Sequence, residues 1–576
     1  MLRLVQVMAV LGTAAIGVRG AHACGGFFCS QPLPNGGLPI AQAAENVLFV
    51  MDTDPATGAK RVEAHIQILY TGPATQFSWI VPVTAVPTVD VGWDILFDRL
   101  EPPTRPSFQL TYQVEGTCEG GGGGGIGCGA VADSATGGGG GGSGGLPPPT
   151  VDVLSRGSVG PFDYVVVRSE DGATLRTWLG TNGYYVSEEA ARIVDEYVAG
   201  FHSFVAVKLQ VGQDTSAIRP IILRLASAEA CLPLKLTAIA ATPDLRINVW
   251  VLADARAIPI NYVEIGVNLA KIDWINGGFN YDQLLKEAAN EADGNAFAVE
   301  YAQKSATATT WFTLMNSSAR ATLSTAPDPA TYLNTLATLG VTPTSAVVQV
   351  LRRYIPLPAS LASQGVTETM FYQGMSYYWS AFRSSFAPFD PVALTAAMEA
   401  EVLAPIDTLR PLFVRNAYLT RLATFISPEE MTKDPLFVTN RLLPDVAPNR
   451  TAIGHILCGD EEYNSCSAPL WIELEDGRRI GWLPRSCGGF GLDRRDIDAM
   501  PSGEVAWNRD PDSEGQMVID NRSAIAQRLA AHNAQVPKLD SGCGCSLRAR
   551  PRSVAMLAAA ATSVMLLVAR RRRRRR

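Results

Sequence analysis

The chain has 576 residues, a formal net charge of −7 and a hydrophobic share of 47%, which suffices for two or three packed domains. Its acidic balance gives it no electrostatic reason to bind phosphate backbones, so we expect no nucleic-acid partner. The body of the chain has no continuous apolar run of about 18 residues, which argues against transmembrane transport.

The first 23 residues have the layout of a cleaved export signal. Arg3 precedes a mostly apolar stretch over residues 4–18, and residues 21–23 (Ala-His-Ala) offer the small side chains that signal peptidase requires. The apolar run stops at this cleavage-like site, which favours a removed signal over a buried N-terminal helix. Cleavage there makes Cys24 the first residue, but a lipoprotein signal fits less well because position 21 lacks an aliphatic side chain.

Residues 24–275 predict an α+β domain rich in antiparallel strands. In RVEAHIQILYTG the apolar residues alternate with Glu63, His65 and Gln67, a period of two that is typical of a half-buried strand. The stretches ENVLFVMD before it and QFSWIVPV after it predict an antiparallel meander. Apolar positions from Ala190 to Phe201 recur at helical spacing, so we expect one amphipathic helix on this sheet.

A glycine-rich insertion interrupts this domain at residues 116–150. Between residues 116 and 145, seventeen of thirty residues are glycine, and three prolines follow. Such a segment buries almost nothing and loses much backbone entropy on ordering. We therefore expect a disordered surface insertion, closed at its base by Cys118 and Cys128.

Residues 276–445 change to a helical pattern and predict a helical subdomain. Asp390 and Pro391 form an N-cap followed by a first-turn proline, and Ser427-Pro-Glu-Glu430 has the form of a capping box. The apolar stripe Val347, Val350, Leu351 and Tyr354 is typical of core packing.

Residues 446–540 predict a small cysteine-rich β subdomain. LWIELEDGRRIGWLP reads as a hairpin with Asp476-Gly477 at its turn, and a final helix is expected at about 522–533. Asp510, Asp512 and Glu514 imitate the first half of a calcium loop, but its twelfth position is Asn521 and no helix pair flanks it. A solvated acidic loop is the preferred interpretation and calcium a weak alternative.

All ten cysteines follow the signal, and an even number in an exported chain favours disulfides. No CxxC pair is present, so structural zinc is not expected. Local spacing suggests that Cys24 pairs with Cys29 and Cys118 with Cys128. Two of the three cysteines at 458–487 are expected to form another pair, and the connectivity stays open. These candidates are Cys24, Cys29, Cys118, Cys128, Cys458, Cys466 and Cys487.

Residues 541–576 form a three-part tail. Cys543 and Cys545 in a Gly-Cys-Gly-Cys motif precede an uncharged stretch at 554–569, which at roughly 24 Å as a helix is marginal for spanning a bilayer. Seven arginines end the chain and favour a cytoplasmic C-terminus. This layout resembles the MYXO-CTERM sorting tag, which implies cleavage by a membrane sorting protease, delivery to the cell surface and lipidation of one of the two cysteines. Without both ends, which carry twelve arginines and no acids, the net charge falls from −7 to −19.

A second resemblance covers most of residues 23–265. ACGGFFC after the signal, then AENVLFVMD, FSWIVPVTAVPTVDVG and LPLKLTAIAATPDLRINVWVL, resemble the bacterial domain-of-unknown-function family 2330 (DUF2330). MTKDPLF at 431–437 continues the match. The resemblance implies an exported protein and carries over no catalytic residue.

Catalytic motifs are missing from the sequence. It has no H-E-x-x-H or Walker motif, no credible Cys-His pair, and four scattered histidines after the signal. We therefore predict a non-enzymatic binding or structural module at the cell surface, with no cofactor and an unknown ligand. The alternative is a secreted hydrolase whose acidic residues meet only in the fold.

Overall fold

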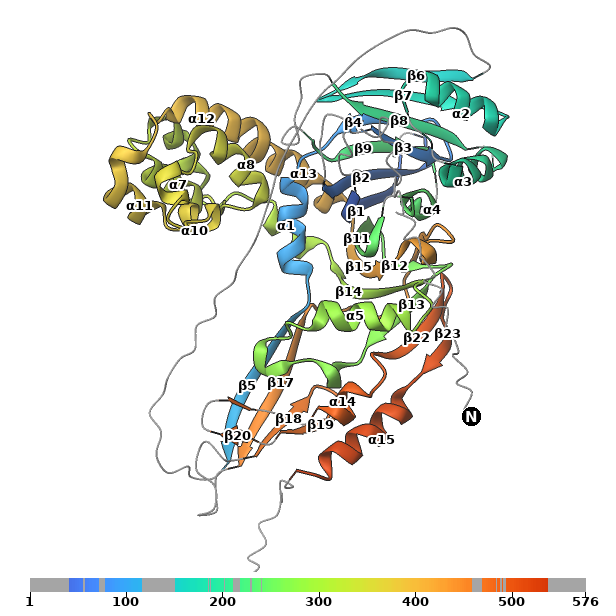
Figure 1. Ribbon diagram of the computed structural model, residues 1–576, viewed down its shortest axis with the longest axis vertical. Helices are drawn as coiled ribbons and strands as arrows, with labels where there is room; N and C mark the ends of the chain where they lie inside the picture. Colours follow the sequence, from blue (N-terminus) through green and yellow to red (C-terminus); the bar gives the residue numbers. More distant parts are fainter. Residues whose placement is uncertain are drawn as a thin grey trace, which may run out of the picture. The chain divides into compact units, whose positions relative to one another are not determined.

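The computed structural model describes residues 41–536 except 55–56, 72–77, 116–150, 185, 187, 201, 211–217, 228–229, 240, 458–468, 483, 487–488 and 491–493 (Figure 1). The predicted signal, the glycine-rich insertion and the sorting tag lie outside these residues. So do the cysteines at positions 24, 29, 118, 128, 458, 466, 487, 543 and 545. Within the described part, we find no helix with the length and apolarity needed to cross a bilayer.

A ten-stranded sheet runs through the described chain (Figure 1). Its strand β1 (Ala41–Thr53) buries consecutive apolar side chains from Val47 to Val50, because both of its faces are covered. β1 pairs antiparallel with β2 (Lys60–Thr71) and parallel with β11 (Ala241–Ala253). The order is β23-β22-β13-β14-β15-β11-β1-β2-β9-β4, where the other strands are β4 (Thr88–Val91), β9 (Ile221–Leu225), β13 (Val263–Val267), β14 (Ala296–Lys304), β15 (Tyr418–Ile426), β22 (Gly503–Asp510) and β23 (Ser513–Asp520).

A four-stranded antiparallel sheet packs on one face of the large sheet. Its Phe162 and Val205 share a core with Val47 and Phe49 of β1. Its order is β3 (Ser78–Val83), β8 (Ser203–Leu209), β7 (Phe162–Arg168) and β6 (Asp152–Val159). Its other face is covered by α2 (Gly172–Thr181) and α3 (Glu188–Ala199), two helices where the sequence predicts one. The short α4 (Leu234–Thr237) adds Leu236 to that second core.

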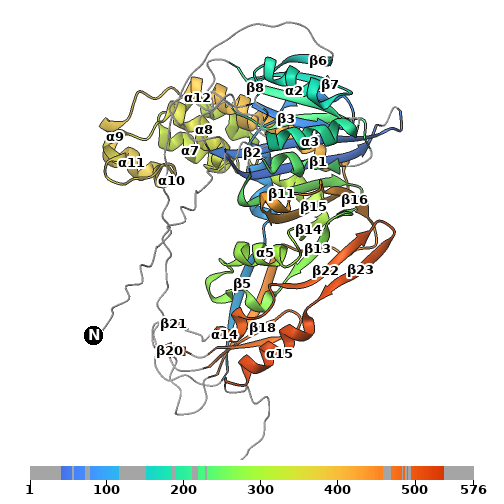
Figure 2. The ribbon, with the colours of Figure 1, turned by 45° about the vertical axis from the view of Figure 1, so that its right-hand side comes forward.

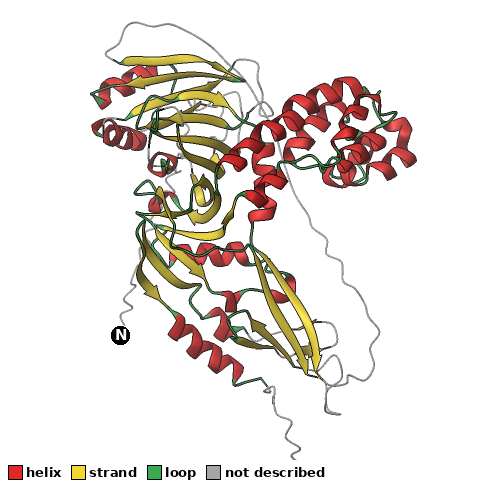
Figure 3. Ribbon diagram, turned by 180° about the vertical axis from the view of Figure 1, so that it is seen from behind, coloured by secondary structure: helices red, strands yellow, loops and turns green. Residues whose placement is uncertain are grey.

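The opposite face of the large sheet carries α1 (Ile95–Thr104) and a group of helices (Figures 2 and 3). Leu48 and Trp250 of the sheet share a core with Leu100 of α1 and Ile406 of α13. The group comprises α6 (Ala306–Trp311), α7 (Pro329–Thr338), α8 (Ser345–Tyr354), α9 (Ala359–Ala362), α10 (Glu368–Gln373), α11 (Met375–Phe382), α12 (Pro391–Met398) and α13 (Ala404–Arg415).

The helix start signals that the sequence predicts at Asp390 and Ser427 are confirmed. The Asp390 side chain accepts hydrogen bonds from the backbone N–H groups of Val392 and Ala393 at the start of α12. Ser427 and Glu430 form the capping box, although the helix it starts is one 3-10 turn. Val347, Val350 and Leu351 are buried on α8, as their spacing predicts.

A third sheet lies in the C-terminal part. Its order is β19 (Arg479–Trp482), β18 (Leu470–Leu474), β17 (Asn449–Leu457) and β5 (Ser107–Glu115), and β5 runs parallel to β17. The β18–β19 hairpin turns at Asp476-Gly477, as predicted, with a positive φ of 82° at Gly477. This sheet shares a core with α5 (Tyr281–Asn290), α14 (Arg495–Asp498) and α15 (Arg522–Asn533), and α15 has its predicted bounds.

Two details of the predicted meander are wrong. β3 does not follow β2 in the sheet: it pairs with β8, and the second neighbour of β2 is β9. All six residues of β3 are buried, which suits a layer covered by both the large sheet and the helices. The polar face of β2 is not solvent-exposed, since His65 is buried with its Nε2 atom 2.8 Å from Glu63 Oε1.

The large sheet takes strands from all three expected ranges. β14 and β15 come from residues 276–445, where the sequence indicates helices, and β22 and β23 come from residues 446–540. β14 and β15 are buried on both faces, so apolar and polar residues do not alternate along them, and the period of two that indicates a strand is missing. A small sheet of β10 (Ala230–Cys231), β16 (Leu436–Asn440) and β12 (Arg256–Pro259) also crosses these ranges. The described residues up to Gln535 belong to one compact unit.

Candidate functional site

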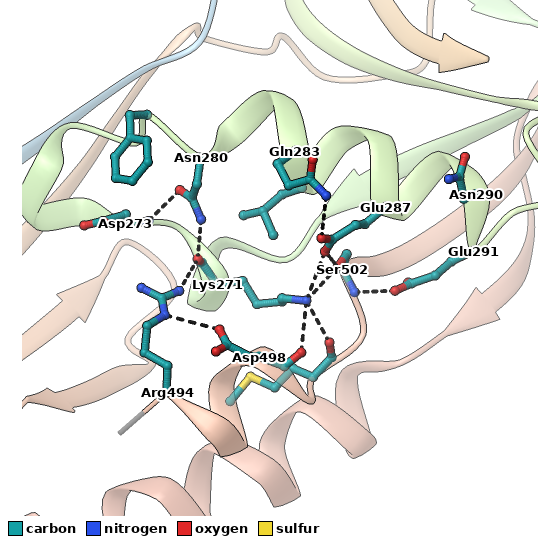
Figure 4. Close-up of a pocket in the computed structure, with 13 residues that line it drawn as sticks. Lys271, Asp273, Asn280, Gln283, Glu287, Asn290, Glu291, Arg494, Asp498 and Ser502 are labelled. Atoms are coloured by element: carbon teal, nitrogen blue, oxygen red, sulfur yellow. Dashed lines mark hydrogen bonds and ion pairs between the residues drawn. The ribbon is translucent and has the colours of Figure 1, made fainter. Parts of the chain in front are cut away.

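A polar cavity of about 880 Å³ lies beside α5 (Figure 4). Its walls come from two segments that are far apart in the sequence, residues 271–291 and residues 494–502. The lining residues are Lys271, Asp273, Phe279, Asn280, Gln283, Leu284, Glu287, Asn290, Glu291, Arg494, Asp498, Met500 and Ser502. The cavity therefore exists only once these two segments have met.

Helix α5 provides the longer wall because it is amphipathic. Gln283, Glu287 and Asn290 follow one another at spacings of four and three, so they share one helix face. The buried side of α5 consists of Tyr281, Leu284, Leu285, Ala288 and Ala289, and of these Leu284 also borders the cavity. Asn280 precedes the helix: its side-chain oxygen accepts from the Asp273 N–H at 2.8 Å, and its amide donates to the Lys271 carbonyl at 3.0 Å.

Lys271 holds the two walls together. Its side chain is buried, and its Nζ atom lies 2.7 Å from Ser502 Oγ, 3.1 Å from the Met500 carbonyl and 3.3 Å from Glu287 Oε2. The Asp498 carbonyl is a fourth acceptor at 3.4 Å. Ser502 Oγ in turn donates to Glu287 Oε2 at 2.6 Å. Figure 4 shows these bonds converging on the ammonium group.

Glu291 fixes the same segment through its backbone. Its two carboxylate oxygens accept from the N–H groups of Ser502 and Gly503, each at 2.8 Å. Charged hydrogen bonds of this kind are among the stronger ones in proteins. The start of β22 is therefore held against the end of α5.

The Lys271–Ser502 pair resembles the amine and hydroxyl of a serine hydrolase, but its surroundings argue against that chemistry. A lysine base must be neutral to take a proton from the serine. Here the Nζ group faces four oxygen acceptors, one of them a carboxylate, and donates hydrogen bonds to them instead of accepting a proton from the serine. Ser502 is only 1% exposed and donates its proton to Glu287, so the pair connects the walls instead of attacking a substrate.

Glu287 is held in its ionised form. Burial acts to raise its pKa, but hydrogen bonds from Ser502 and Gln283 and the nearby Lys271 charge outweigh burial and leave the pKa below its usual value. A general acid in a hydrolase needs the opposite shift. Glu287 is therefore suited to accepting hydrogen bonds rather than to donating a proton.

Several groups at the cavity are open to a ligand. Gln283 and Asn290 are exposed amides, and the Phe279 ring is 74% exposed. Arg494 donates to Asp498 Oδ1 at 3.2 Å and to the Lys271 carbonyl at 3.1 Å. Four carboxylates and two cations line the cavity, so its formal charge is negative. The cavity combines hydrogen-bond donors and acceptors with one aromatic surface.

Two carboxyl groups with separated pKa values lie elsewhere, on the helix-covered face of the large sheet. Burial raises the pKa of Asp94 to about 6, whereas hydrogen bonding to His65 and the charges of His65 and Arg224 outweigh burial and lower the pKa of Glu63 to about 2. Asp94 accepts from Gln67 at 2.6 Å. Glu63 is engaged with His65 and Arg224. Each carboxyl group is therefore occupied by protein partners, which favours a structural role for both.

The weak calcium alternative finds no support in the described residues. Asp510, Asp512 and Glu514 lie at the β22–β23 hairpin, where Asp510 Oδ1 accepts from the Asp512 N–H at 2.9 Å and so caps its own turn. In the part of the chain that the structure describes, no group of three or more His, Cys, Asp or Glu side chains can hold a metal ion. Cys231, the one described cysteine, is half-buried on β10 and lines a separate small cavity with His202 and Asp434.

The sequence interpretation did not identify the cavity residues. The spacing of Gln283, Glu287 and Asn290 on an amphipathic helix was the only available signal, and it is equally typical of a solvated face. Nothing in the sequence links Lys271 to Ser502, since their contact depends on the path of the chain between them.

One family model matches the chain. It is described as an uncharacterized protein conserved in bacteria, DUF2330, and it covers residues 37–437. No curated protein and no solved structure gives a match. The matched region includes the 271–291 wall of the cavity, whereas the 494–502 wall lies beyond it. Because the model spans well over half of the sequence, the chain belongs to the DUF2330 family, which its sequence motifs resemble.

Proposed function

We propose that this protein is an exported binding module of the cell surface whose cavity beside α5 takes a small, neutral, polyhydroxylated ligand such as a sugar residue of a surface polysaccharide. Export is supported by the signal-like N-terminus and by the tail that resembles a sorting tag. The high negative charge of the chain between these ends suits a protein that stays soluble outside the cell.

The single observation that carries the ligand proposal is the composition of the cavity. Exposed amides at Gln283 and Asn290 can each donate and accept, which matches hydroxyl groups that do both. The exposed Phe279 ring offers an apolar surface for the C–H face of a sugar. The excess of carboxylates over cations disfavours an anionic ligand.

Binding is preferred to catalysis because the reactive groups of the cavity are engaged with one another. Lys271 and Ser502 connect the walls, and Glu287 is held ionised. These bonds make the cavity rigid before a ligand arrives, which lowers the entropic cost of binding.

Titration calorimetry with the purified chain tests the ligand. We expect a neutral hexose oligomer such as maltohexaose to bind and an oligogalacturonate, its acidic counterpart, not to bind. Phe279→Ala should weaken binding at least several-fold, whereas Tyr377→Ala, which removes another exposed aromatic ring far from the cavity in sequence, should not. Stronger binding of the acidic oligomer, or equal effects of the two substitutions, would refute the proposed ligand class.

Mass spectrometry of the protein from its native cells tests export. The expected mature chain begins at Cys24 and lacks the arginine tail, with a modification on Cys543 or Cys545. A native chain that retains both ends would contradict the proposed location.

A further inference from the structure

The third sheet has one edge strand, β5, that lacks the protection found on the other sheet edges. β5 is nine residues long and pairs continuously with β17, without a bulge. Among the described residues, it has no neighbour on its other side. Its sequence SFQLTYQVE holds no proline and only one charged residue, Glu115 at its end.

The opposite edge of the same sheet is closed by side chains of α15. Asn533 accepts from the Gly481 N–H at 2.9 Å, and its amide donates to the Arg479 carbonyl. His532 Nε2 lies 2.7 Å from the Gly481 carbonyl. These contacts occupy backbone groups of β19 that would otherwise be open to another strand.

The remaining edges of the described sheets are also blocked or short. β3 contains Pro82, and β6 has a register irregularity between Val153 and Ser155. The pairing of β23 with β22 has two register irregularities, and β23 itself carries acidic residues. β4, β10 and β12 have no more than four residues each, and neither do β20 (Pro484–Ser486) and β21 (Gly489–Phe490), which pair only with each other. β5 is therefore the exception among the edges, and its exposed backbone is suited to strand addition.

The side chains of β5 show what partner the edge fits. Phe108, Leu110, Tyr112 and Val114 alternate with Gln109, Thr111 and Gln113, so one face is apolar and the other polar. The beginning of the apolar face is covered, with Phe108 against Trp274, whereas Tyr112 is 48% and Val114 57% exposed.

This pattern is self-complementary about Thr111. If two copies of β5 pair antiparallel with Thr111 opposite Thr111, then Leu110 lies opposite Tyr112 and Phe108 opposite Val114. On the polar face, Gln109 lies opposite Gln113, and no like charges meet. The exposed half of each strand thus pairs with the covered half of the other.

We propose that β5 is a dimerisation edge, through which a second copy of this chain adds its own β5 in antiparallel register. The two four-stranded sheets would then form one continuous eight-stranded sheet across a two-fold axis. This inference is independent of the ligand proposed above, because the edge and the cavity use different residues.

Charge substitution on the polar face tests both the edge and the register. In Q109K/Q113K both Gln109–Gln113 cross-strand pairs place two lysines opposite each other, and Q109E/Q113E places two glutamates there. Both glutamines are exposed, so neither variant is expected to unfold the monomer. Q516K/V518K makes the matched change on the exposed side of β23.

Sedimentation velocity over a concentration series, with thermal unfolding as a check on folding, measures the outcome. We expect wild type and Q516K/V518K to form dimers, the two β5 variants to be monomers, and an equimolar mixture of the two β5 variants to recover the dimer. Recovery on mixing cannot come from misfolded protein. A monomeric wild type, including one that instead binds an unrelated extended peptide, overturns the proposal, as does a dimer that both β5 variants retain.

Discussion

Lys271 Nζ lies 2.7 Å from Ser502 Oγ, and this contact joins positions separated by 231 residues. Glu287 touches both partners, so one ammonium, one hydroxyl and one carboxylate form a closed triangle in the wall of the cavity. Each group satisfies the other two, which is why a buried lysine is tolerated there.

Lys271→Met should destabilise the chain by about 3–5 kcal/mol, because it leaves a carboxylate and two carbonyls without their cation. Urea unfolding measures this loss. Lys286→Met on α5 is the control, since Lys286 makes a more exposed ion pair with Asp244 at 3.2 Å and should cost at most about 1 kcal/mol. Equal losses in the two variants would show that the triangle contributes no special stability.

Glu45→Gln should change how stability depends on pH. Burial raises the pKa of Glu45 from 4.5 to about 7, opposed by the hydrogen bond from Gln42 at 2.8 Å. A folded-state pKa above the unfolded one stabilises the fold below pH 4.5, and this contribution is lost as the pH rises through 7. The variant should therefore gain up to about 3 kcal/mol over wild type above pH 7 and almost nothing at low pH.

Chemical unfolding across this pH range measures the gain from Glu45→Gln. The exposed Glu514→Gln is the matched change and should leave the pH profile of wild type unaltered. A gain that is constant with pH would mean that the pKa of Glu45 is the same in the folded and unfolded states, which would contradict the prediction.

Gly278→Ala should cost more stability than Gly365→Ala. Both glycines have positive φ angles, +72° and +82°, so both substitutions carry the backbone strain of about 1 kcal/mol. A Cβ atom at Gly278 would also lie 2.2 Å from Phe108 Cδ2, whereas one at Gly365 meets nothing within 4 Å. The difference between the melting temperatures of Gly278→Ala and Gly365→Ala measures the effect of the clash. Equal melting temperatures would mean that Phe108 can move aside freely.

Arg421→Met should be strongly destabilising, by about 3–5 kcal/mol, because Glu300 would lose the cation 2.8 Å away in a site where both side chains are fully buried. Without Arg421, Glu300 would keep only its longer contact with Arg246 at 3.5 Å. Adding Glu300→Gln removes this poorly compensated charge and should recover part of that loss. A double-mutant cycle by denaturant unfolding checks the coupling, and strict additivity of the two losses would contradict it.

Local features were the most predictable from the sequence. The bounds of α15, the Asp390 cap and the turn at Gly477 depend on neighbouring residues, and the structure has all three. Strand partners were less predictable, because β3 and β9 carry equally apolar residues and only the packing of layers decides which one lies beside β2.

The cavity could not be predicted from the sequence, for a related reason. Its helical wall has a recognisable polar face, but its other wall becomes part of the site only through contacts such as that between Glu291 and Gly503. Long-range contacts of this kind leave no periodic pattern in either segment.

The strand orders of the large sheet and of the third sheet restrict how the chain can be assembled. In the large sheet, β13 pairs with β22, which comes from residues 503–510. In the third sheet, β5 pairs with β17, and Asn449 of β17 lies 342 positions after its partner Ser107 in β5. A nascent chain therefore cannot complete these layers one after another as it emerges, and sequence-distant pairing of this kind makes folding slow. Nearly the whole polypeptide must be released from the ribosome before either sheet has all its strands.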